Sequence, residues 1–131
     1  MTVVVAHQVS PTSRAALVQG ITEAAFRSTD LVVLHVVESL DADRREAYRL
    51  GVADEIEKIV GQEPGVPWEL RLSIAGADLG DTLLSLVDEV DADLLVIGAR
   101  RRSPVGKAFL GSVAQKLILE ANLPVLVVKT P

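Results

Sequence analysis

The chain has 131 residues, of which 49% are hydrophobic and 24% charged, and its formal net charge is −5. This length predicts a single domain over residues 1–131, and the composition excludes a disordered or fibrous protein. An acidic chain is also a poor binder of nucleic acid or of an anionic membrane surface, because both attract positive charge. We therefore expect a globular protein that engages neither.

The sequence has no cysteine, which excludes a disulfide framework, a zinc–thiolate site and a thiol nucleophile. Its two histidines, His7 and His35, make a poor metal-binding set. The first seven residues have neither the basic start of a secretory signal nor the length of a membrane-spanning helix. We expect a cytoplasmic location.

Apolar runs typical of buried strands alternate along the chain with segments of helical period. The first half predicts a strand at 3–6, a helix from Pro11 to about 27–29, a strand at 31–37 and a helix at 41–60. The second half predicts a strand at 68–74, a helix at 79–90, a strand at 93–97, a helix from Ser112 to about 121 and a strand at 125–128. This alternation requires an α/β fold with a parallel sheet and helices on both faces.

The strand at 68–74 alternates polar and apolar residues, which predicts that it lies at an edge of the sheet with one wet face. The last strand, at 125–128, is apolar throughout. If it also lies at an edge, its unpaired backbone groups favour pairing with a second copy of the chain. We therefore expect a homodimer through residues 125–128.

The segment from 93 to 112 carries the strongest indication of a ligand site. An apolar run breaks at Gly98 and is followed by a basic loop, and the loop ends at Gly111 and Ser112. Ser112 with Gln115 forms a capping-box pattern for the next helix. Cationic side chains beside the free amides of a helix start favour a phosphate. The basic side chains of the loop are Arg100, Arg101, Arg102 and Lys107.

Two common phosphate motifs are absent from the sequence. A dinucleotide fingerprint needs three spaced glycines after the first strand, and residues 6–10 contain none. A Walker loop needs a glycine five residues before a Gly-Lys pair, whereas Gly106-Lys107 has Arg101 there. The sequence therefore disfavours ordinary NAD or FAD binding and excludes the usual P-loop.

The spacing that remains is Gly98, two residues, Arg101, nine residues, then Gly111-Ser112. This pattern resembles the nucleotide-binding motif of the universal stress protein family, and the resemblance covers essentially the whole chain. It is supported by segments 10–17, 34–38, 92–98 and 123–128. The resemblance implies a universal stress protein domain with a three-layer, flavodoxin-like (adenine nucleotide alpha hydrolase-like) fold and strand order 3-2-1-4-5.

The same resemblance implies an adenine nucleotide, ATP, as a regulatory ligand in stress response, with magnesium present only through the nucleotide. It also implies a dimer through the last strand. The residues implied on the base and ribose side are Ala6, His7, Gln8 and Val36. The residues implied around the phosphates are Gly98, Arg101, Gly111, Ser112 and Val113, with Ile97 in the same site.

Two positions depart from the family pattern. Arg101 stands where nucleotide-binding members usually carry a second glycine, so it either blocks close approach of the backbone to a phosphate or replaces amide contacts with a charge. Gln8 stands where the family often has an acidic residue, and it can hydrogen-bond but carries no charge.

Several of these residues also have a purely structural interpretation. Gly98 either ends a strand at an unusual backbone angle or opens the backbone beside a phosphate, and the two roles are compatible. Gly111-Ser112 is either only a helix cap or an anion site. A structural role is the commoner outcome for a histidine such as His7, and His35 is expected in the core.

Three functions remain open from the sequence. The favoured one is a regulatory, non-enzymatic protein that binds ATP. The first alternative is a nucleotide-free dimeric interaction module whose pocket Arg101 and Gln8 have disabled. The second is slow ATP hydrolysis, which is less favoured because the sequence offers neither a clear general base nor a carboxylate set for magnesium. No catalytic residue is assigned.

Overall fold

The computed structural model describes residues 2–8, 11–61, 65–100 and 111–130. Its elements run β1 (Thr2–His7), α1 (Pro11–Phe26), β2 (Asp30–Val37), the 3-10 turn η1 (Ala42–Arg44) and α2 (Arg45–Val60). They continue with β3 (Trp68–Ile74), α3 (Leu79–Val90), β4 (Leu94–Arg100), α4 (Ser112–Glu120) and β5 (Val125–Thr130). Every predicted strand and helix is present, and the short 3-10 turn before α2 is an addition.

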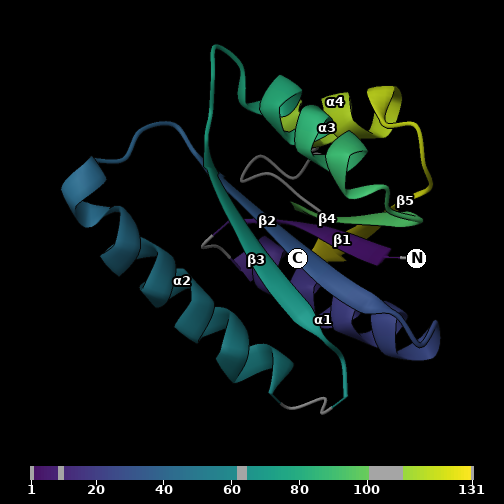
Figure 1. Cartoon of the computed structure of the whole chain (residues 1–131). Coiled ribbons are helices and arrows are strands. Elements are labelled where there is room, and N and C mark those ends of the chain that lie inside the picture. The colour runs from purple at the N-terminus through teal and green to yellow at the C-terminus, as the bar shows by residue number, and fades with distance from the viewer. Residues whose placement is uncertain (1, 9–10, 62–64, 101–110, 131) are drawn as a thin grey trace.

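The strands form one parallel sheet in the order β3-β2-β1-β4-β5. The implied order is therefore confirmed, and β3 and β5 are the two edge strands. Helices α1 and α2 cover one face of the sheet, and α3 and α4 cover the other (Figure 1). None of the helices in the described part of the chain has the length and hydropathy that a bilayer-spanning segment needs.

A separate apolar core fills each side of the sheet. On the α1 and α2 side, Val5 of β1, Leu17 of α1 and Ile56 of α2 are fully buried. On the α3 and α4 side, Leu95 of β4 and Leu117 of α4 are buried in the same way. Because full burial of such a side chain contributes about 1.5–3 kcal/mol, these two cores hold the helices in fixed positions over the strands.

Strand β4 does not end at Gly98, and in this respect the prediction was wrong. The strand continues to Arg100 because β5 supplies pairing partners, beginning with Val128 opposite Gly98. Glycine is required at position 98 because there is no space for a side chain, and not because of an unusual backbone angle. A Cβ atom built on Gly98 would overlap the carbonyl oxygen of Thr12 and lie 2.7 Å from its carbonyl carbon. The first turn of α1 therefore passes directly over β4 at this residue.

The predicted capping box at Ser112 was also wrong. Gly111 is the N-cap residue of α4, and Ser112 is the first residue with helical backbone. The backbone N–H of Gln115 donates to the carbonyl of Gly111 at 2.9 Å, and Gly111 itself has no side chain that could cap this helix. The first backbone amides of α4 therefore receive no cap from the side chain of their own N-cap residue.

Candidate functional site

A cavity of about 610 Å³ lies beyond the carboxyl ends of β1 and β4, between the first turns of α1 and α4. Strand β1 stands between β2 and β4, so the chain leaves it toward one edge of the sheet and later returns on its other side. Ligands of open parallel sheets bind at such a reversal of strand order. The volume is also in the range of small-molecule sites.

Most of the residues implied for the nucleotide site line this cavity, and they come from four different strands and helices. Ser112, which is exposed, is not among the lining residues. Arg101 lies outside the described residues, so its effect on the site stays a prediction. The lining residues that were named from the sequence are Ala6, His7, Gln8, Val36, Ile97, Gly98, Gly111 and Val113.

The sequence reasoning missed other lining residues. Thr12 and Ser13 enter from α1, Leu83 from α3, and Thr130 from the end of β5. Ser13 is buried, and its hydroxyl oxygen accepts a hydrogen bond of 2.9 Å from the backbone N–H of Gln8. This bond holds the chain where it leaves β1. The presence of Thr12 and Ser13 in the site could have been predicted. A helix that begins four residues after a strand must bring its first turn to the end of that strand.

Both apolar and polar side chains line the cavity. Val36, Ile97 and Val113 present hydrocarbon surface, as an aromatic base requires. His7 and the exposed Arg100 at the end of β4 provide a hydrogen-bonding ring and a positive charge. The lining therefore suits a ligand that combines an aromatic ring with an anionic group.

Two buried histidines contact each other, and one of them, His7, lines the cavity. His7 and His35 are paired residues of neighbouring strands, and they are 4% and 2% exposed. Their Nδ1 atoms lie 3.0 Å apart, and His35 Nε2 lies 2.8 Å from the hydroxyl of Tyr48 on α2. The expectation that His35 belongs to the core is confirmed, but a chain of three linked side chains was not foreseen.

Both imidazoles are neutral at pH 7. Burial, and then the proximity of His35, lower the pKa of His7 from its ordinary value of 6.5 to about 4. Burial also lowers the pKa of His35, although a hydrogen bond to the backbone of His7 and the carboxylate of Glu55 act in the opposite direction. In a neutral pair that is hydrogen-bonded through the two Nδ1 atoms, the Nδ1–H of one ring donates a hydrogen bond to the unprotonated Nδ1 of the other.

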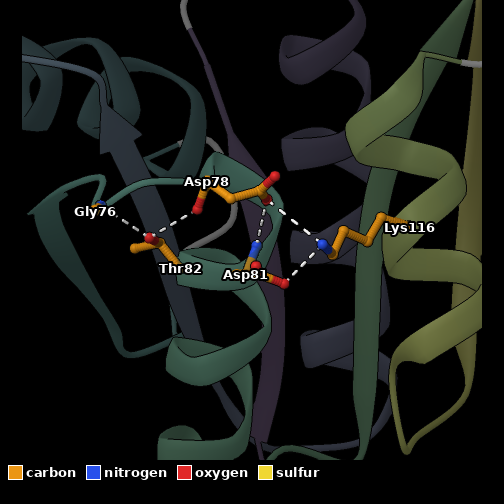
Figure 2. Close-up of polar contacts among 5 residues, drawn as sticks. All are labelled: Gly76, Asp78, Asp81, Thr82 and Lys116. Carbon is orange, nitrogen blue, oxygen red and sulfur yellow. Dashed lines mark hydrogen bonds and ion pairs between the residues drawn. The ribbon is translucent and has the colours of Figure 1, made fainter.

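A cluster of polar side chains joins α3 and α4, the two helices on the face of the sheet opposite α1 and α2 (Figure 2). The Asp78 carboxylate caps α3 by accepting from the backbone N–H of Asp81 at 2.9 Å, and the Thr82 hydroxyl accepts from the N–H of Gly76 while donating to the Asp78 carbonyl. Lys116 of α4 reaches across to Asp81 at 2.7 Å and to Asp78 at 3.6 Å. These ion pairs connect α3 to α4, and each of these helices lines the cavity.

Relatives of known family share this architecture. The sequence model of the "Universal stress protein family" matches residues 1–129. A universal stress protein of Mycolicibacterium smegmatis is 46% identical over 97% of this chain and 96% of its own length. The chain belongs to the universal stress protein family.

Solved structures of universal stress proteins superpose on the whole chain. One from Archaeoglobus fulgidus has a TM-score of 0.81 and 32% identity and covers 98% of both chains. Another structure of the universal stress protein from that organism, solved in complex with dAMP, has a TM-score of 0.74 and 28% identity, again over 98% of both chains. The family suggested by the sequence is thereby confirmed, together with the fold.

Among the described residues of this universal stress protein, no three His, Asp or Glu side chains are grouped closely enough to hold a metal ion.

Proposed function

We propose that this protein binds an adenine nucleotide in the cavity between β1 and β4 and acts in the cytoplasm as a nucleotide-responsive regulator in stress response. The observation that carries the proposal is the cavity itself, which has the size of a nucleotide site and lies at the reversal of strand order. The universal stress protein of Archaeoglobus fulgidus in complex with dAMP supports the adenine class.

The lining suggests how the ligand lies. We propose that the base packs against Val36 and Ile97, with Ala6 and Gln8 toward the ribose. The phosphates then lie toward Gly111 and Arg100, because the N-terminal amides of a helix and a guanidinium both stabilise an anion. ATP is the proposed ligand, and magnesium enters only with its phosphates.

Substitutions at Gly111 test this site without damaging the fold. A Cβ atom on Gly111 would have no neighbour within 4 Å among the described residues, and the φ of −59° suits any residue. Asp and Asn are good N-cap residues, so Gly111→Asp and Gly111→Asn should each keep or slightly raise the stability of α4. The two substituted side chains have almost the same size, and the negative charge of aspartate is the difference between them.

We expect ATP and AMP to raise the thermal midpoint of the unsubstituted protein, since ligand at a hundred times its dissociation constant adds about 2.7 kcal/mol. Gly111→Asp should weaken binding of ATP by about tenfold or more through repulsion of the phosphates, whereas Gly111→Asn should weaken it less. Calorimetric titration measures each affinity. No binding of either nucleotide at millimolar concentration, or equal affinities for the two variants, would contradict the proposal.

We further propose that the protein is a homodimer joined through β5. This strand pairs with β4 along one side, from Val125 opposite Leu95 to Thr130 opposite Arg100, and it is an edge of the sheet. An edge strand of apolar residues is an available template for pairing with a second copy. Sedimentation at micromolar concentration should give a particle of twice the 14.0 kDa chain mass. A monomer under these conditions would contradict the dimer.

A further inference from the structure

One ring nitrogen of His7 has no hydrogen-bond partner among the residues that the structure describes. The side chain is 4% exposed and lines the cavity, and its Nδ1 is engaged by His35. Within the described part of the chain, no hydrogen bond reaches its other nitrogen, Nε2. Buried polar groups are nearly always hydrogen-bonded, so an exception beside a cavity indicates a partner supplied from outside the protein.

The link between Tyr48 and His35 determines which of the two imidazoles donates. A phenol O–H is a strong donor and a weak acceptor, whereas the bare nitrogen of a neutral imidazole is a good acceptor. The stable arrangement of the 2.8 Å contact therefore has the Tyr48 hydroxyl donating to His35 Nε2. His35 must then carry its proton on Nδ1.

The proton position on His35 in turn determines the proton position on His7, which lines the cavity. With its proton on Nδ1, His35 donates across the 3.0 Å contact to Nδ1 of His7. His7 then accepts at Nδ1 and carries its own proton on Nε2, the nitrogen that no described residue contacts. Three side chains from β1, β2 and α2 thus fix the tautomer of the residue that faces the ligand.

We propose that Tyr48 and His35 are positioning residues that set His7 as an Nε2–H donor, and that this N–H donates to an acceptor atom of the nucleotide in the cavity. The identity of the ligand rests on the proposed function, but the tautomer does not. Acceptors of this kind on an adenine nucleotide are phosphate oxygens, ribose oxygens and the unprotonated ring nitrogens of the base.

Nitrogen-15 NMR of the histidine rings in the ligand-free protein at neutral pH tests the tautomers directly. We expect a protonated, pyrrole-type Nε2 and a pyridine-type Nδ1 for His7, and the reverse for His35. Tyr48→Phe removes the hydroxyl and leaves the ring, so His35 loses the donor at Nε2. The pattern at His7 should then move toward Nδ1–H, which a merely structural role of Tyr48 would not cause.

Leu50→Ala provides the matched control, because Leu50 lies two residues away on α2 and is exposed. It should leave both histidine tautomers unchanged. In titrations with AMP, Tyr48→Phe should weaken affinity by about threefold to tenfold, the equivalent of one hydrogen bond, and Leu50→Ala should have no effect.

A protonated Nδ1 on His7 in the unsubstituted protein would overturn the inference, and so would a His7 pattern that Tyr48→Phe leaves unchanged. If the unsubstituted protein does not bind AMP or ATP, the proposed function fails and with it the nucleotide as acceptor. The ring nitrogens of the ligand-free protein still decide whether Tyr48 and His35 set the tautomer.

Discussion

Replacing Gly98 with alanine is expected to destabilise the fold by about 2–3 kcal/mol, because the new methyl group has no space. It would overlap the Thr12 carbonyl oxygen and come within 2.7 Å of the carbonyl carbon. These atoms belong to the backbone of α1, so they cannot turn aside as the end of a flexible side chain can. Either α1 moves away from the sheet or β4 is displaced, and the cavity between them changes shape.

Urea unfolding measures this loss, and Gly51→Ala is the matched control. Gly51 lies within α2, is exposed, and has nothing within 4 Å of a Cβ position. An alanine there should stabilise the protein by about 0.5–1 kcal/mol, because glycine is a poor helix former. If Gly98→Ala were as stable as the unsubstituted protein, the close passage of α1 over β4 would be wrong.

Acidification is expected to cost about 2–3 kcal/mol of stability between pH 6.5 and pH 4, through His7 alone. The folded state holds the pKa of His7 at about 4, while the unfolded chain has the ordinary value of 6.5. Within this interval the unfolded state binds more protons than the folded state, so stability falls as the pH falls. His35, whose pKa is also lowered by burial, acts in the same direction.

Urea unfolding at about pH 7 and about pH 5 measures this effect, and His7→Asn isolates it. Asparagine can keep a polar contact with His35 but does not titrate in this range. The difference in unfolding free energy between the two pH values should be clearly smaller in the variant, whatever its stability at neutral pH. An identical pH dependence would show that His7 is not held neutral by burial.

The order and type of the elements could be read from the sequence because the signals are local. The apolar run at 31–37 has few alternatives to a buried strand, and the helical period at 79–90 is equally clear. The end of β4 was not predictable in this way. Residues after Gly98 stay in the sheet because β5 pairs with them, and that partner lies some thirty residues further along the chain.

The position of the candidate site could be predicted from the sequence, but the hydrogen bonds among its side chains could not. The ends of β1 and β4 mark the cavity from sequence alone, whereas the link between His7 and His35 depends on strand register. The sequence did contain a partial indication of this contact. Each histidine comes directly after the first four apolar residues of its predicted strand, so in two neighbouring parallel strands that start level the two histidines lie side by side. The contribution of Tyr48 depends on how α2 packs, which no local pattern specifies.

Amide chemical-shift mapping with AMP tests the central claim, that the cavity between β1 and β4 is the nucleotide site. We predict that the amides perturbed on titration cluster at His7 and Gln8, at Gly98 and in the first turn of α4 around Val113. The amides of α2 far from Tyr48, such as Lys58, should not move. Perturbations confined to other faces of the protein, or none at saturating nucleotide, would contradict the claim.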